Sequence, residues 1–169
     1  ILGNPNADLV IVEYSDTGCP FCKQFHKTMQ TLMNEYGKGG KVAWVYRHFP
    51  IDQLHPNSRK EAEATECASE LGGPEKFWAY TNTIYERAPQ NGGFKAEQLK
   101  TIAKDIGLDV TAFNECLSSG RKAAVVEADY QDGVKAGARG TPYSLIIRKK
   151  DGSKVPISGA QPYASLKGT

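Results

Sequence analysis

The feature that most constrains this chain is a pair of cysteines, Cys19 and Cys22, placed where a strand pattern gives way to a helix pattern. Residues 8–15 form a nearly continuous apolar run, which is typical of a buried strand. Pro20 suits the first position of a helix, where a missing N–H is harmless and φ is already set. Apolar residues then recur at helical spacing, at Cys22, Phe25, Met29, Leu32, Met33 and Tyr36. We therefore predict that Cys19 caps a helix and that Cys22 lies one turn in, on the buried stripe.

A helix N-terminus gives these thiols a specific chemistry. Its free N–H groups and positive dipole end favour an anion, so we expect Cys19 to ionise easily. Thiols of Cys-x-x-Cys pairs in this setting have pKa values of about 3.5–7.5, against about 8.5 for a free cysteine. A disulfide between Cys19 and Cys22 would then be attacked readily and would tend to oxidise other proteins, with Cys22 resolving the mixed disulfide.

Two plainer interpretations of this pair stay open, namely a structural disulfide and half of a zinc site. Zinc normally requires a second close pair of ligands, and Cys67 and Cys116 stand alone. Both lie on the apolar stripes of predicted helices, so they face the interior and are predicted to form a structural disulfide, stabilising by about 2–5 kcal/mol. The alternative is two free buried cysteines that pack as small hydrophobes.

The strand pattern predicts the fold class. Residues 41–49 form a second strand, and the order strand, helix, strand predicts a right-handed crossover with parallel pairing. Residues 143–148 and 154–158 form two further strands, joined by a hairpin turn at 150–153. The expected fold is α/β, with a mixed sheet of about four strands flanked by helices.

A long middle stretch, residues 57–120, carries helical periodicity and no convincing strand pattern. A helix at 121–137 then leads back to the sheet. We expect one α/β domain to consist of residues 1–56 and 121–169, with residues 57–120 inserted as an all-helical subdomain.

Composition narrows the class of protein. The chain has 169 residues, 24% charged and 40% hydrophobic, which is ordinary for a soluble globular protein. Its net charge of +2 favours neither nucleic acid nor an anionic membrane surface as a partner. No apolar run approaches the ~18 residues of a membrane-spanning helix, and no signal peptide is recognisable, which is compatible with a removed leader or anchor. Four cysteines, an even number, fit an oxidising compartment.

Glu13 lies six residues before Cys19, and Gly140-Thr141-Pro142 lies far downstream of the Cys-Pro-Phe-Cys motif. Together these features resemble the DsbA-like thiol–disulfide oxidoreductases of the thioredoxin-fold superfamily. DsbA itself has histidine where this chain has Phe21. Weaker similarity covers nearly the whole chain, at residues 4–7, 76–80, 129–133 and 158–163. The resemblance implies that residues 1–56 and 121–169 form a thioredoxin-like domain and that residues 57–120 are its inserted helical subdomain. It also implies a cis peptide bond before Pro142; the alternative at that bond is an ordinary trans turn.

The same resemblance implies a function. It implies an enzyme without a cofactor that introduces disulfide bonds into extracytoplasmic proteins, in the periplasm, the cell envelope or the secreted medium. Reduced or misoxidised substrate proteins would exchange with Cys19, and a separate membrane redox partner would recycle the Cys19–Cys22 pair. Thr141, Pro142 and Phe21 would bind the substrate. The alternatives are a disulfide reductase or isomerase of the same fold, and a non-catalytic chaperone or adaptor that uses the groove beside Pro142.

Glu13 is a candidate proton carrier. Strand alternation places it on the face opposite Tyr14, and a buried carboxyl with a raised pKa could accept the proton that Cys22 loses. The alternative is a strand-end carboxylate held by a neighbouring base. The three histidines, His26, His48 and His55, are expected to be solvated or structural rather than partners of a catalytic cysteine.

Overall fold

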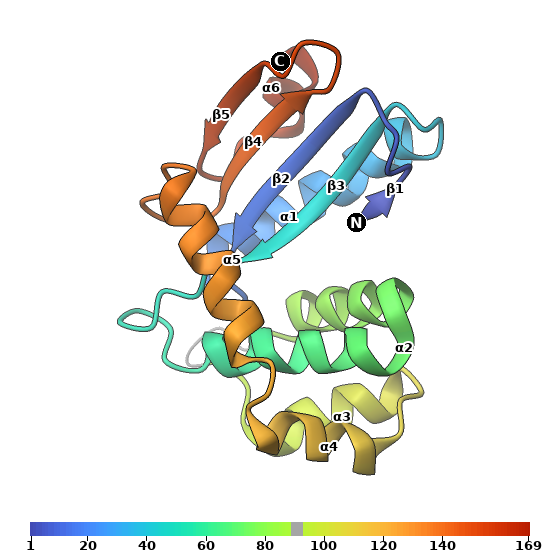
Figure 1. Cartoon of the computed structure of the whole chain (residues 1–169), viewed down its shortest axis with the longest axis vertical. Helices are drawn as coiled ribbons and strands as arrows, with labels where there is room; N and C mark the ends of the chain where they lie inside the picture. The colour runs from blue at the N-terminus through green and yellow to red at the C-terminus, as the bar shows by residue number, and fades with distance from the viewer. Residues whose placement is uncertain (89–92) are drawn as a thin grey trace.

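A computed structural model describes residues 1–88 and 93–169, which are built around one five-stranded mixed sheet (Figure 1). β2 and β3 are parallel, β4 is antiparallel to β2, and β5 is antiparallel to β4. The spatial order is β1-β3-β2-β4-β5, and the bounds are β1 Leu2–Gly3, β2 Leu9–Ser15, β3 Val42–His48, β4 Tyr143–Arg148 and β5 Lys154–Ser158. The predicted mixed α/β sheet is confirmed, with one strand more than the four expected.

The additional strand is β1 at the edge of the sheet. Its two residues, Leu2 and Gly3, pair antiparallel with Trp44 and Ala43 of β3. Two residues are too few to show the alternation that marks a strand in a sequence. This strand is therefore recognised only from its pairing with β3 in the structure.

The central strand β2 places alternate side chains on the two faces of the sheet. Ile11 belongs to the core under α1 (Pro20–Leu32), where Cys22, Phe25 and Met29 are fully buried. A π-helical turn, η1 (Met33–Gly37), continues α1, and α6 (Tyr163–Gly168) packs against α1 on the same face. Tyr14 lies on the opposite face, where its hydroxyl donates to Asp132 of α5 (Ala123–Lys135) at 2.6 Å.

Three helices lie between β3 and α5, below the sheet in Figure 1: α2 Ser58–Arg87, α3 Ala96–Asp105 and α4 Val110–Ser119. Non-helical backbone at Gly72 and Gly73 breaks α2 into two helical segments. Cys67 of α2 and Cys116 of α4 form a disulfide with their Cα atoms 5.8 Å apart. These helices share a hydrophobic core of their own, formed by Ala64, Cys67, Ala68, Tyr80, Ile84, Phe94, Leu99, Ile102, Ala103, Phe113, Cys116 and Leu117. The sequence pattern predicts a loop at residues 89–93, and most of it lies outside the described residues.

Helix α5 returns the chain to the sheet and crosses the face opposite α1 (Figure 1). It can approach closely because of Gly133. A Cβ at this position would come within 2.6 Å of the Phe49 ring and 2.9 Å of the Tyr14 ring. The loop after α5 then carries Thr141 and Pro142 to the start of β4.

Candidate active site

The two cysteines of the motif lie at the junction of β2 and α1. Cys19 is the N-cap of α1, with extended backbone at φ −83° and ψ 122°, and Pro20 occupies the first turn. The backbone N–H of Cys19 donates to the Asp16 carbonyl at 3.1 Å. Cys22 is completely buried, and Cys19 is 6% exposed. Both thiols are free, so the structure represents the reduced form.

The electrostatics of the two thiols differ sharply. The pKa of Cys19 falls to about 6, chiefly because the Cys22 thiol donates a hydrogen bond to its sulfur, with backbone N–H groups of α1 adding to the effect. Burial raises the pKa of Cys22 well above its ordinary value. At neutral pH Cys19 is therefore a thiolate and Cys22 a thiol. This is the division that the helix-cap prediction requires.

The turn before Cys19 is held by Asp16, a residue that the sequence interpretation missed. Its buried carboxylate accepts hydrogen bonds from the backbone N–H groups of Gly18 and Ile51, both at 2.8 Å, and lies 2.9 Å from His55 Nδ1. The Asp16 backbone N–H in turn donates to Cys22 Sγ at 3.4 Å. In the sequence, the only local indication that Asp16 holds this turn is its position three residues before Cys19.

Helix α2 braces the same turn from the other side. Ser58 Oγ accepts a hydrogen bond from the Gly18 N–H at 3.1 Å, and a Cβ at Gly18 would come within 2.5 Å of that oxygen. Glu61, completely buried, accepts hydrogen bonds from the Thr17 hydroxyl and from the Phe94 N–H at 2.7 Å. The inserted helices thus take part directly in shaping the dithiol turn.

The loop before β4 approaches the cysteines from the side. The Thr141–Pro142 peptide bond is cis, and Cys19 Sγ lies 3.6 Å from the Thr141 carbonyl oxygen. The Pro142 carbonyl accepts a hydrogen bond from the Gly159 N–H at 2.9 Å, which fixes the loop to the end of β5. Phe21 is 62% exposed. The structure therefore brings Thr141 and Cys19 together and leaves Phe21 accessible from solvent.

Glu13 is completely buried in β2, between Tyr46 of β3 and Ser144 of β4 in the strand ladders. Within the part of the chain that the structure describes, neither carboxylate oxygen has a hydrogen-bond partner. Burial raises the pKa of this carboxyl to about 7. No basic side chain forms an ion pair with it among the described residues, so the geometry does not support the alternative of a carboxylate held by a base.

The three histidines have their own partners. His26 Nε2 lies 2.7 Å from Asn82 Oδ1, and its ring stacks on Tyr85 at 4.5 Å. Burial lowers the pKa of His26 to about 4, so the ring is neutral at physiological pH. His48 pairs with Glu66 at 3.1 Å, and His55 pairs with Asp16. Each histidine has a structural partner, and among the described residues no hydrogen bond joins one to Cys19 or Cys22.

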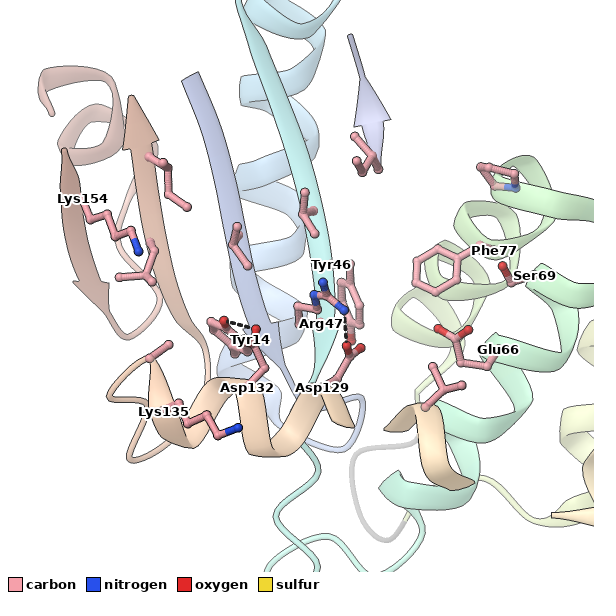
Figure 2. Close-up of a pocket in the computed structure, with 18 residues that line it drawn as sticks. Tyr14, Tyr46, Arg47, Glu66, Ser69, Phe77, Asp129, Asp132, Lys135 and Lys154 are labelled. Atoms are coloured by element: carbon pink, nitrogen blue, oxygen red, sulfur yellow. Dashed lines mark hydrogen bonds and ion pairs between the residues drawn. The ribbon is translucent and has the colours of Figure 1, made fainter. Parts of the chain in front are cut away.

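A hollow of about 740 Å³ lies on the sheet face opposite α1, between the strands, α2 and α5 (Figure 2). Its floor is apolar, and some of its polar groups are paired with one another. Arg47 forms an ion pair with Asp129, and Tyr14 donates to Asp132. None of the residues that line it is a cysteine. The hollow is therefore separate from the dithiol site.

The fold and the dithiol define a class, namely thioredoxin-fold proteins with a Cys-Pro-x-Cys pair at a helix start. The profile of a family described as Thioredoxin matches residues 1–161. The chain therefore belongs to this thioredoxin family.

Solved structures narrow the comparison to DsbA-like folds. BdbD from Bacillus subtilis is 23% identical, with a TM-score of 0.85 and coverage of 99% of this chain and 88% of BdbD. DsbA2 from Pseudomonas aeruginosa is 24% identical, with a TM-score of 0.81 and coverage of 98% and 88%. A thioredoxin-like oxidoreductase from Silicibacter pomeroyi is 26% identical, with a TM-score of 0.76 and coverage of 99% and 87%. The fold implied by the sequence resemblance is thus confirmed.

The curated relatives are longer proteins. Na(+)/H(+) antiporter NhaA 3 of Salinispora tropica is 29% identical over 86% of this chain and 21% of its own length. Na(+)/H(+) antiporter NhaA of Herminiimonas arsenicoxydans is 31% identical over 86% of this chain and 22% of its own length. The chain thus spans about a fifth of the length of these relatives. Among the residues that the structure describes, no helix is long and apolar enough to cross a membrane.

Proposed function

We propose that this chain is a thiol–disulfide oxidoreductase that introduces disulfide bonds into extracytoplasmic proteins. The observation that carries the proposal is the unequal pair of thiols. Cys19 has a pKa of about 6 at a helix N-terminus, and Cys22 is a buried thiol with a raised pKa. A stabilised Cys19 thiolate favours the reduced form of the enzyme, which makes its disulfide an oxidant.

The reaction consists of two exchanges. A substrate thiolate attacks Cys19 Sγ of the Cys19–Cys22 disulfide, and Cys22 leaves as a thiolate that takes up a proton. A second substrate thiolate then attacks the substrate sulfur bound to Cys19, forms the new disulfide and releases the Cys19 thiolate. Two electrons pass from the substrate to the enzyme, and the substrate leaves oxidised.

Glu13 is our candidate for the group that exchanges this proton with Cys22. Its pKa of about 7 lets it donate or accept near neutral pH. In substrate oxidation it supplies a proton to the leaving Cys22 thiolate. In reoxidation it accepts the proton that Cys22 must lose before attacking a mixed disulfide.

Thr141, Pro142 and Phe21 are the proposed substrate contacts. The Thr141 backbone lies beside Cys19, so an extended segment carrying the reacting cysteine can add to this loop as a strand. Pro142 has no N–H of its own and leaves that backbone to the substrate. Phe21 offers an exposed aromatic surface between the two cysteines.

The proposed partners are reduced or misoxidised substrate proteins and a membrane protein that reoxidises the Cys19–Cys22 pair. The Cys67–Cys116 disulfide supports the periplasm, cell envelope or secreted medium as the site of action, because structural disulfides persist in oxidising compartments. A reductase or isomerase of the same fold is the second candidate, since the same dithiol exchanges electrons in either direction.

A redox titration tests this proposal. The protein is equilibrated in glutathione buffers, and the fraction of reduced Cys19–Cys22 pair is measured by alkylation. We expect a reduction potential of about −120 mV, together with oxidation of a reduced two-cysteine peptide. A reduction potential of about −270 mV would favour a reductase. One below about −300 mV would indicate a structural disulfide, as expected for a non-catalytic chaperone or adaptor.

A further inference from the structure

A cluster of buried hydroxyl groups lies beside Cys22 and has no role in the reaction described above. Tyr85 OH is 2.9 Å from Ser15 Oγ and 2.8 Å from Tyr46 OH. All three residues are buried, with exposures of 1% for Ser15, 6% for Tyr46 and 2% for Tyr85. Each hydroxyl can both donate and accept, so the cluster is a continuous path for a proton.

The three hydroxyls come from three parts of the fold. Ser15 ends β2, Tyr46 belongs to β3, and Tyr85 extends from the long helix α2. The Tyr85 ring is held by stacking on His26 at 4.5 Å. Because this stacking holds the Tyr85 ring in place, the Tyr85 hydroxyl stays beside Ser15 Oγ.

Glu13 and Cys22 flank this cluster. Glu13 and Ser15 share one face of β2, and Glu13 lies opposite Tyr46 in the parallel β2–β3 ladder. On the other side, the backbone N–H of Asp16, the residue after Ser15, donates to Cys22 Sγ at 3.4 Å. Glu13 has two buried carboxylate oxygens without a hydrogen-bond partner among the described residues. The Ser15 hydroxyl lies close enough to both groups to lower the pKa of the Glu13 carboxyl and that of the Cys22 thiol. It is therefore placed between a thiol that must exchange a proton and an acid able to exchange one.

We propose that the Ser15 hydroxyl, held by the hydroxyls of Tyr85 and Tyr46, carries the proton between the Cys22 thiol and the Glu13 carboxylate. This inference rests on the proposed function, because it assigns a route to the proton that the exchange reaction moves. Ser15 and Tyr85 are then proton-relay and positioning residues, and helix α2 supplies part of the catalytic environment.

The transfer balances at every atom. When Cys22 attacks a mixed disulfide on Cys19, its S–H proton passes to Ser15 Oγ while the original Ser15 proton passes to Glu13. Ser15 ends as a neutral hydroxyl, Glu13 becomes a carboxylic acid, and the new S–S bond expels the leaving thiolate. The tyrosines stay protonated, since burial raises the pKa values of Tyr46 and Tyr85 well above their ordinary value.

The pH dependence of this step involves a small set of groups. The ionisable side chains that face the cluster come from β2, β3, α1 and α2, and are Glu13, Tyr46, His48, Cys19, Cys22, His26 and Tyr85. His26 has a pKa of about 4 and has titrated before Glu13 reaches its midpoint near pH 7, and Cys19 is held in the mixed disulfide during this step. The part of a rise in the rate of the Cys22 step through pH 7 that Glu13→Gln removes therefore reports Glu13.

The test follows the two thiols separately with Ellman's reagent, a small aromatic disulfide. Attack by Cys19 releases the first coloured thiolate, and closure by Cys22 releases the second. For Ser15→Ala we expect the second phase to slow by about ten-fold or more and to lose its rise near pH 7. The first phase should stay within about two-fold of wild type. Ser15→Thr, which keeps the hydroxyl, should restore the second phase and its pH profile.

Tyr85→Phe keeps the ring on His26 and removes only the hydroxyl, so it serves as a second variant if Ser15→Ala does not fold. It should slow the second phase by about three-fold and reduce its deuterium solvent isotope effect. Equal slowing of both phases, or no change in either, would overturn the relay. If Ser15→Ala behaves as wild type while Glu13→Gln slows only the second phase, the relay fails and the role of Glu13 stands. If the wild-type protein does not oxidise a reduced peptide, the proposed function itself fails.

Discussion

Cys19 and Cys22 lie at the start of α1, whereas Cys67 and Cys116 are separated by 49 residues and lie within two facing helices. Except for Cys19, which is 6% exposed, these cysteines are completely buried, so burial alone does not distinguish the two pairs. The first pair has a helix N-terminus, Glu13 and a set of hydroxyls around it. The second lies in a core of apolar and aromatic side chains. The surroundings, and not the residue type, make one pair reactive and the other structural.

Replacing the cysteines of the first pair breaks this comparison most strongly. Cys19→Ser should reduce peptide oxidation to the background rate, because the attacked sulfur is lost. Cys22→Ser should accumulate mixed disulfides through Cys19, because no thiol is left to resolve them. Non-reducing gels after incubation with substrate measure both outcomes. Equal trapping by the two variants would contradict the assignment of Cys19 as the exchanging thiol.

Removing the second pair should change stability instead. We expect the double variant Cys67→Ala/Cys116→Ala to lose about 4 kcal/mol of unfolding free energy, since the disulfide closes a loop of 49 residues in the unfolded chain. Peptide oxidation should stay within about two-fold of wild type at a temperature where both proteins are folded. Urea unfolding under non-reducing conditions measures the loss. A matching loss of activity without unfolding would show that the two pairs are coupled.

Glu13 gives the surroundings of the first pair a dependence on pH that the apolar core around Cys67 and Cys116 lacks. Its pKa of about 7 exceeds its ordinary value of 4.5, so between these pH values the folded protein holds a proton that the unfolded chain has released. Stability therefore falls as pH rises from 4.5 to 7, by up to about 3 kcal/mol.

Glu13→Gln removes this effect. It should unfold at a higher temperature than wild type at pH 8 and at the same temperature at pH 4. The exposed substitution Glu97→Gln in α3 is the matched control and should show no such dependence. A Glu13→Gln variant less stable than wild type at pH 8 would mean that the carboxylate has a favourable partner.

The smallest expected effect concerns Phe21, the exposed residue between the reactive cysteines. Phe21→His places an imidazole beside Cys19, and its protonated form should lower the Cys19 pKa by less than about one unit. The thiolate absorbance at 240 nm measures the shift against wild type. No shift would show that the helix N-terminus and Cys22 alone determine the acidity of Cys19.

Much of the fold follows from local sequence pattern. The apolar run of β2, the Pro20 helix start and the Asp-Gly hairpin turn each specify their own element. The facing helices of the inserted region also followed, because each has a clear apolar stripe. The placement of Cys19 at the cap of α1 needed no information beyond its neighbours in the chain.

The parts that did not follow are contacts between distant residues. Ser15 and Tyr85 are 70 residues apart, and Thr17 and Glu61 are 44 apart. A serine at a strand end, or a glutamate within a helix, has many ordinary uses, and no spacing marks its partner. Asp16 shows the same limit, because its carboxylate reaches His55 and the Ile51 backbone across a turn that the sequence does not position.

The contacts of Ser58 and Glu61 with the dithiol turn have a consequence for biosynthesis. Cys19 and Cys22 precede α2 in the chain, so they emerge from the ribosome before Ser58 and Glu61, which hold their turn. In the unfolded chain Cys19 is an ordinary cysteine with a pKa of about 8.5 and is mostly protonated. Its pKa falls only when the start of α1 and Cys22 are in place around it. The reactive thiolate is therefore a property of the folded turn, which limits disulfide exchange while the chain is still being made.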